Sequence, residues 1–105
     1  MQQPTLTVMI VDDHPLMRRG IRQLLALEPR LDVIAEANNG TEALAEARRL
    51  APDIILLDLN MKGMSGLDTL KALRHEGISS RILIFTVSDA RSDIDAMVDR
   101  KSTRL

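Results

Sequence analysis

Short apolar runs alternate with stretches of helical periodicity along the chain, and no other feature limits its possible folds as much. The predicted strands are Leu6–Val11, Leu31–Ala37, Ile54–Leu57 and Arg81–Thr86, and the predicted helices are Pro15–Leu27, Thr41–Leu50, Ser65 to near Gly77, and Ser88–Val98. Apolar residues recur every three or four positions in the helical stretches. Strands that alternate with helices over short links form a parallel sheet with helices on its faces, and nearly continuous apolar strands are typical of such burial. The sequence therefore predicts an α/β fold.

The composition fits one small domain and excludes several function classes. The 105 residues carry a net charge of -1 and no cysteine. The chain therefore shows neither the basic character of a nucleic-acid-binding domain nor the residues for a disulfide or a thiolate metal site. No apolar run approaches the roughly 20 residues of a membrane span, and the amino-terminal residues lack the pattern of a signal peptide. We expect a cytoplasmic protein without a membrane contact.

Two of the predicted strands run directly into aspartates. The first strand is followed by Asp12 and Asp13, and the third by Asp58. If these strands are neighbours in a parallel sheet, the three carboxylates meet in the crevice beyond the strand ends, where such sheets bind ligands. Carboxylates this close repel one another unless a cation joins them, and Mg²⁺ suits oxygen ligands and phosphate chemistry. The backbone carbonyl of Asn60 could reach the same ion, and the hydroxyl of Thr86 could reach a phosphate oxygen.

Several of these polar residues also have a purely structural interpretation. A single aspartate after a strand more often caps the next helix, but two consecutive acids and a third at a matching strand end are harder to explain in that way. His14 is interpreted as a helix-start residue rather than a metal ligand, because no second histidine lies nearby in the sequence, and His75 as a solvated residue near a helix end. The pair Arg18 and Arg19 is interpreted as part of a solvated helix face.

Three segments carry a resemblance to a known family. They are VMIVDDHPLMRRGIRQLL, ILLDLNMKGMSGLDTLKALR and IFTVSD, and together they resemble the receiver domain of bacterial two-component response regulators. Within that family the chain is similar to the subfamily that responds to nitrate and nitrite, whose receivers normally precede a helix-turn-helix DNA-binding domain. The resemblance covers residues 7–98 and implies a flavodoxin-like, doubly wound parallel sheet with strand order 2-1-3-4.

The resemblance also implies a role for each candidate site residue. Asp58 corresponds to the phosphoacceptor, which takes a phosphoryl group from phosphohistidine on a sensor histidine kinase. Asp13 and Asp58 would bind Mg²⁺ directly, together with the carbonyl of Asn60, while Asp12 would contribute through water. Thr86 would be the switch hydroxyl that turns toward the phosphoryl group. The chain is thus expected to be a phosphoacceptor module that normally controls a transcriptional output domain, and not a turnover enzyme.

The chain departs from the family pattern in two places. Lys62 stands where the family usually has proline, which removes no chemistry. The resemblance ends near Val98, so we expect a truncated receiver over residues 1–98 and a tail over residues 99–105 outside the family, without the fifth strand and fifth helix. The fourth strand would then be an open edge and the first helix would carry uncovered apolar surface, both of which favour self-association. Without an output domain, this chain alone is not expected to bind DNA.

Two other functions compete with the phosphoacceptor hypothesis. A truncated receiver could act only as an interaction domain that does not switch. A Mg²⁺-dependent phosphatase with an aspartate nucleophile would need a second acid two residues after Asp58, and Asn60 at that position argues against it. A dinucleotide-binding fold is disfavoured, because no glycine-rich turn follows the first strand.

Overall fold

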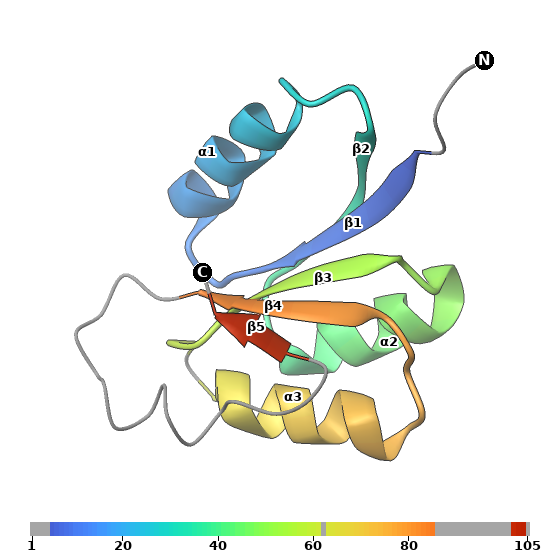
Figure 1. Ribbon diagram of the computed structural model, residues 1–105. Helices are drawn as coiled ribbons and strands as arrows, with labels where there is room; N and C mark the ends of the chain where they lie inside the picture. The colour runs from blue at the N-terminus through green and yellow to red at the C-terminus, as the bar shows by residue number, and fades with distance from the viewer. Residues whose placement is uncertain (1–4, 62, 86–101, 105) are drawn as a thin grey trace.

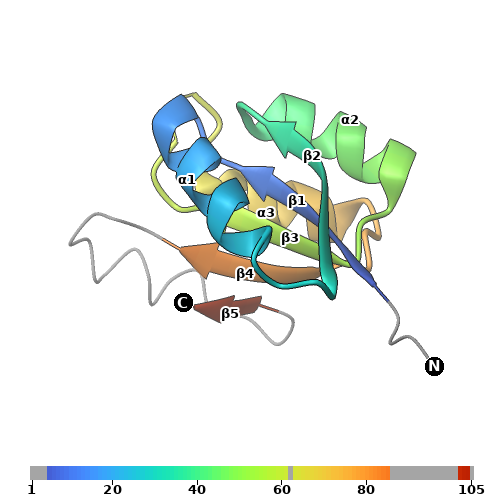
Figure 2. The ribbon, with the colours of Figure 1, turned by 90° about the horizontal axis from the view of Figure 1, so that it is seen from above.

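The computed structural model describes residues 5–61, 63–85 and 102–104. The elements are β1 (Leu6–Val11), α1 (Pro15–Leu25), β2 (Leu31–Ala37), α2 (Gly40–Leu50), β3 (Ile54–Asp58), α3 (Gly66–His75), β4 (Arg81–Phe85) and β5 (Ser102–Arg104). The strands form one parallel sheet in the order β2-β1-β3-β4-β5 (Figures 1 and 2). The predicted α/β class and the order of the first four strands are confirmed. The predicted helix Ser88–Val98 lies outside the described residues.

The sheet divides the core into two layers. In Figure 1, α1 lies on one face of the sheet and α2 and α3 lie on the other. Alternate side chains of β1 point to opposite faces of the sheet. Met9 and Val11 pack on the face that carries α2 and α3, and Val8 and Ile10 pack on the face that carries α1. All four side chains are buried. This double burial explains why β1 is apolar without interruption.

Side-chain caps begin two of the helices where the sequence pattern predicts them. The Oδ1 atom of Asn39 accepts a hydrogen bond from the backbone N–H of Glu42 at 2.8 Å, and the Glu42 side chain accepts one from the N–H of Asn38 at 2.7 Å. The Oγ atom of Ser65 accepts from the N–H of Asp68 at 3.1 Å. These bonds satisfy donors that a helix start leaves without partners. They therefore fix where α2 and α3 begin.

The sheet has a fifth strand that the sequence analysis did not predict. Residues Ser102–Arg104 pair in parallel with Ile82–Ile84 of β4. The prediction that the sheet stops at four strands, with an open edge along β4, is therefore wrong for this part of β4. Strand pairing joins backbone N–H and C=O groups, so a polar segment can add to a free strand edge without an apolar pattern. Hydropathy alone gives no signal for such a strand.

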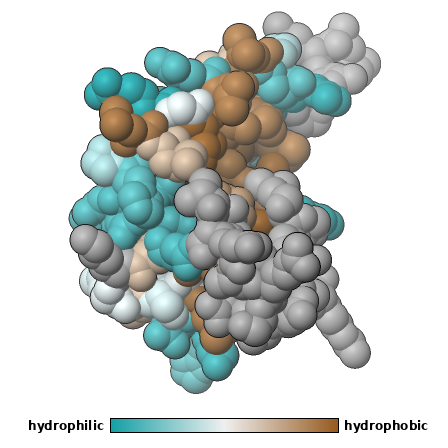
Figure 3. All heavy atoms as spheres, turned by 90° about the vertical axis from the view of Figure 1, so that its left-hand side faces the viewer, coloured by the Kyte–Doolittle hydropathy of each residue, from teal (hydrophilic) through white to brown (hydrophobic). Residues whose placement is uncertain are grey.

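Helix α1 leaves much of its apolar surface exposed. None of its residues is buried, and Leu16 and Leu24 are 81% and 69% exposed, as is Leu27 just beyond the helix at 80%. Figure 3 shows hydrophobic side chains gathered on the upper part of the face that carries α1. This is the exposed apolar surface expected on the first helix.

Candidate functional site

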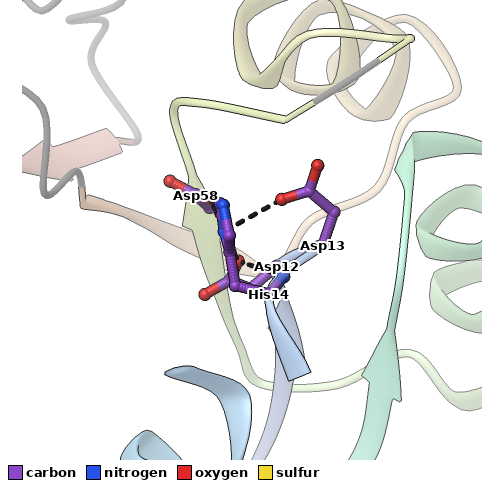
Figure 4. Close-up of side chains that lie close together, drawn as sticks. All are labelled: Asp12, Asp13, His14 and Asp58. Atoms are coloured by element: carbon purple, nitrogen blue, oxygen red, sulfur yellow. Dashed lines mark hydrogen bonds and ion pairs between the residues drawn. The ribbon is translucent and has the colours of Figure 1, made fainter. Parts of the chain in front are cut away.

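The three predicted acids converge at the carboxyl end of the sheet. Strands β1 and β3 are direct neighbours, with Val11 opposite Leu57, so Asp12 after β1 and Asp58 at the end of β3 meet. Asp12 and Asp58 are buried, at 0% and 2% exposure. One carboxylate oxygen from each of Asp12, Asp13 and Asp58 and a ring nitrogen of His14 all lie within 4.8 Å of one another (Figure 4).

The backbone around the acids holds their carboxylates in place. The Oδ1 atom of Asp58 accepts a hydrogen bond from the N–H of Asn60 at 3.0 Å, and the Oδ1 atom of Asp12 accepts one from the N–H of His14 at 2.9 Å. The Oδ2 atom of Asp12 is buried and has no hydrogen-bond partner among the described residues. A buried carboxylate oxygen without a donor is costly. This oxygen and the convergent acids fit a bound divalent cation.

Burial raises the pKa of Asp58 to about 6. Burial is the largest cause of this rise and the negative charge of Asp12 adds to it, whereas the N–H of Asn60 and the positive charge of His14 act in the opposite direction. A raised pKa is expected for desolvated acids that share a site without a cation. A divalent ion would remove the repulsion and favour the ionised carboxylate.

His14 lies in the site, although the sequence analysis did not assign it there. It is the N-cap residue of α1, as its predicted helix-start position requires, but its side chain makes no capping hydrogen bond. Instead, its Nδ1 atom lies 2.8 Å from Oδ1 of Asp12, 2.9 Å from Oδ1 of Asp13 and 3.6 Å from Oδ2 of Asp58. The hydrogen bond to Asp12 raises the pKa of His14 most, and the charges of all three aspartates add to it. The position of His14 directly after the two aspartates was the sequence signal that could have placed it in the site.

Arg18 links α1 to the loop that carries the acids. Its Nη1 atom donates hydrogen bonds to the backbone carbonyl of Asp12 and, at 2.8 Å, to Oδ1 of Asn38, while its Nε atom donates to Glu36 at 3.2 Å. Its side chain is only 17% exposed. The interpretation of Arg18 as part of a solvated face is therefore wrong. An arginine on the polar side of a helix gives no sequence signal that it reaches back to the preceding strand.

The loop after Asp58 is packed closely against the end of β3. A Cβ atom added to Gly66 would lie 2.5 Å from the carbonyl oxygen of Asp58 and 2.8 Å from Cα of Leu59, and the N–H of Gly66 donates to the carbonyl of Leu59 at 3.3 Å. Asn60 lies in this loop, where its N–H holds Asp58. The predicted role of the Asn60 carbonyl stays a prediction. Thr86 and Lys62 lie outside the described residues.

A groove of about 910 Å³ leads from the exposed face of α1 to the acids. Its apolar walls include Leu16, Met17 and Leu24, and its inner end reaches His14 and Asp58. The groove therefore connects the exposed apolar side chains of α1 with the acidic site. Among the described residues, no helix is long and apolar enough to span a bilayer.

The fold and this acidic site are those of a known family. The model of the response regulator receiver domain matches residues 8–103. The chain belongs to this receiver family. The match extends past residue 98, where the sequence resemblance was placed to end, and the division into residues 1–98 and 99–105 stays a prediction. The receiver carries the family's acidic cluster in Asp12, Asp13 and Asp58.

The receiver is similar to curated nitrate/nitrite response regulators. It is 65% identical over 92 residues to the nitrate/nitrite response regulator protein NarP of Escherichia coli (strain K12), covering 88% of this chain and 43% of NarP. It is 57% identical over 97 residues to the nitrate/nitrite response regulator homolog of Haemophilus influenzae, covering 92% of this chain and 47% of that protein. The chain thus spans less than half the length of these relatives.

Solved receiver structures share the same fold. The signal receiver domain of the putative response regulator NarL from Mycobacterium tuberculosis superposes with a TM-score of 0.88 at 30% sequence identity, covering 98% of this chain and 85% of that one. Receivers are generally signalling modules rather than turnover enzymes, and the family implies a sensor kinase as partner.

Proposed function

We propose that this receiver accepts one phosphoryl group on Asp58 from phosphohistidine of a sensor histidine kinase. The observation that carries the proposal is the buried Asp58 carboxylate at the end of β3, surrounded by Asp12, Asp13 and His14. A carboxylate is an established nucleophile for forming an aspartyl phosphate. In the transfer, an oxygen of Asp58 forms a bond to phosphorus, the P–N bond of phosphohistidine breaks, and the imidazole leaves with the electron pair.

The residues of the site prepare Asp58 for this reaction. With a pKa of about 6, Asp58 is mostly ionised at neutral pH and can act as a nucleophile. The hydrogen bond from the N–H of Asn60 fixes the direction of its carboxylate, which keeps one oxygen available for attack.

The acidic cluster supports Mg²⁺ as the cofactor. Asp12, Asp13, Asp58 and the carbonyl of Asn60 are the groups proposed to hold it. When bound, Mg²⁺ neutralises charge on the transferring phosphoryl group and orients it for in-line attack. The buried Oδ2 atom of Asp12, which lacks a donor among the described residues, supports a cation at this place. We propose Thr86 as the hydroxyl that responds to the phosphoryl group.

The wider role is proposed from the relatives. Two of them are named nitrate/nitrite response regulators, so we propose a cytoplasmic receiver that serves the same kind of two-component system. Its normal output would be transcription, through a DNA-binding domain of the whole protein, and this chain alone would not bind DNA.

The exposed face of α1 favours a second candidate function, a non-switching interaction domain. Leu16, Leu24 and Leu27 present apolar surface that could join two copies of the chain. Sedimentation of the wild-type chain and of a Leu16→Ser, Leu24→Ser double variant tests this. A concentration-dependent dimer that the variant loses supports self-association through α1, and a wild-type chain that stays monomeric argues against it.

A donor with a P–N bond tests the proposed phosphoacceptor role and separates it from phosphatase activity. Phosphoramidate with Mg²⁺ should load at most one phosphoryl group per chain, and p-nitrophenyl phosphate should show no sustained hydrolysis. Continuous release of p-nitrophenol that Asp58→Asn abolishes would instead support the phosphatase. The absence of both phosphoryl uptake and p-nitrophenol release in the presence of Mg²⁺ would contradict the phosphoacceptor and the phosphatase functions and would favour the interaction domain.

A further inference from the structure

The ring of His14 lies among the acids of the site but has no role in the proposed phosphoryl transfer. Its Nδ1 atom faces the acids, at 2.8 Å from Oδ1 of Asp12 and 2.9 Å from Oδ1 of Asp13 (Figure 4). Oδ2 of Asp58 lies 3.6 Å away on the third side. The nitrogen thus belongs to the same cluster as the three carboxylates.

These separations are those of atoms that can share one metal ion. Ligands that bind a divalent ion at about 2.1 Å lie roughly 3 Å apart in neighbouring octahedral positions and roughly 3.4 Å apart in a tetrahedron. The three distances from Nδ1 span this range. The three carboxylate oxygens and the nitrogen all lie within 4.8 Å of one another, so one ion could contact all four groups.

A second observation at the same place supports a bound cation. The side chain of Asp12 is fully buried, and its Oδ2 atom has no hydrogen-bond partner among the described residues. Oδ1 of the same group already accepts from the N–H of His14. The His14 ring is 57% exposed, so it can adjust its position while Asp12 stays fixed.

We propose that Nδ1 of His14 is a nitrogen ligand that allows the acidic site to bind divalent transition-metal ions, with Zn²⁺ as the representative, in competition with Mg²⁺. Mg²⁺ takes oxygen ligands and gains nothing from an imidazole, whereas imidazole is a preferred ligand of Zn²⁺ and its neighbours in the first row. A site with three carboxylates and one imidazole therefore holds such an ion more tightly than the carboxylates alone. The inference rests on the proposed cation role of the cluster and adds a second class of ion to it.

The consequence is a receiver in which Zn²⁺ displaces Mg²⁺ from Asp58. A resident Zn²⁺ would occupy Asp12, Asp13 and Asp58 with His14 as fourth ligand, which suits a closed tetrahedral site. With its coordination complete, the ion would leave no position for a phosphoryl oxygen. Zn²⁺ is then expected to inhibit phosphoryl uptake that Mg²⁺ supports.

Calorimetric titration of Zn²⁺ and of Mg²⁺ into three proteins tests the inference: the wild-type chain, His14→Ala, and His75→Ala as the matched control at the chain's other histidine. His14→Ala should weaken Zn²⁺ binding about tenfold or more, which corresponds to about 1.4 kcal/mol, and should change Mg²⁺ binding less than about threefold. His75→Ala should leave both affinities as in the wild type. An equal Zn²⁺ affinity in His14→Ala and wild type would overturn the inference.

Long-range ¹H–¹⁵N NMR of the wild-type chain gives a readout that does not depend on how the variants fold. Zn²⁺ should shift the Nδ1 resonance of His14 and leave both ring nitrogens of His75 unmoved, whereas an unmoved His14 Nδ1 would overturn the inference. Phosphoryl uptake with Mg²⁺ alone, measured on the same samples, separates the two claims. Uptake without a Zn²⁺ effect at His14 rejects only the inference, and absence of uptake rejects the proposed function.

Discussion

The guanidinium group of Arg18 donates a hydrogen bond to the backbone carbonyl of Asp12. Through this bond the first turn of α1 holds Asp12, the residue that opens the acidic loop. The same guanidinium group also binds Glu36 and Asn38 at the end of β2. The acidic site is therefore supported from the neighbouring strand as well as from its own.

Replacing Arg18 with alanine is expected to weaken the site. Arg18→Ala removes the hydrogen bonds to Asp12 and Asn38 and should lower the free energy of unfolding by about 1 to 2 kcal/mol, and the affinity for Mg²⁺ should fall with it. Arg22→Ala is the control, because Arg22 pairs with Glu36 but not with the acidic loop; an exposed pair of this kind contributes about 0 to 1 kcal/mol. Calorimetry that finds the same Mg²⁺ affinity in both variants would refute the supporting role.

The raised pKa of Asp58 predicts a pH-dependent effect of Asp58→Asn on stability. Burial holds this pKa near 6, above its ordinary value of 3.8, so folding favours the neutral acid. The stabilising contribution of the neutral acid is fully present below pH 3.8 and is lost as the pH rises through 6. Without metal, Asp58→Asn should therefore be more stable than wild type at pH 7.5, by about 1 to 3 kcal/mol, and nearly equal to it near pH 4. Chemical unfolding in chelator at both pH values measures the difference in the free energy of unfolding between the two proteins. The same difference at pH 4 and at pH 7.5 would contradict this prediction.

Mg²⁺ should stabilise the wild-type fold by mass action. At a concentration 100 times its Kd, a ligand of the folded state raises the free energy of unfolding by about 2.7 kcal/mol. Asp12→Asn keeps the shape of the side chain but removes one of the buried charges, so it should lose most of the Mg²⁺-dependent gain. Asp32→Asn, at an exposed position on β2, should keep it. Thermal unfolding with Mg²⁺ and with chelator gives the comparison, and equal gains in the two variants would place the ion elsewhere.

Gly66 is expected to be intolerant of any side chain. The Cβ atom of Gly66→Ala would meet the backbone of Asp58 and Leu59, which cannot move without disturbing the end of β3, so the free energy of unfolding should fall by about 1 to 3 kcal/mol or more. Gly20 is the matched control, because its added Cβ meets nothing within 4 Å beyond its chain neighbours and the backbone of its own helix. Gly20→Ala should stabilise α1 by up to about 1 kcal/mol. Similar unfolding midpoints for the two variants would contradict the packing of the loop.

Most of the sheet could be predicted from the sequence because β1 and β3 are largely buried apolar runs and β2 has a half-buried alternating pattern. The ranges Leu6–Val11 and Leu31–Ala37 agree with the observed β1 and β2. The convergence of Asp12 and Asp58 followed from the parallel pairing of their strands. The apolar pattern thus predicted the strands, and the position of the aspartates at the strand ends predicted the site.

The features that sequence reasoning missed all depend on contacts without a hydropathy signal. Strand β5 is a backbone pairing of polar residues with β4. Arg18 belongs to the site through a carbonyl and an amide side chain rather than through a charge pattern. The ring of His14 could have turned to solvent, and its direction is set by carboxylates that only the folded chain brings together.

The intact mass of the chain after treatment with a small phosphodonor tests the central claim most directly. Wild type and Asp32→Asn should gain the mass of one phosphoryl group with Mg²⁺ and none in chelator, and Asp58→Asn should gain none under either condition. The account is contradicted if Asp58→Asn is loaded as fully as wild type, or if wild type stays unmodified in the presence of Mg²⁺.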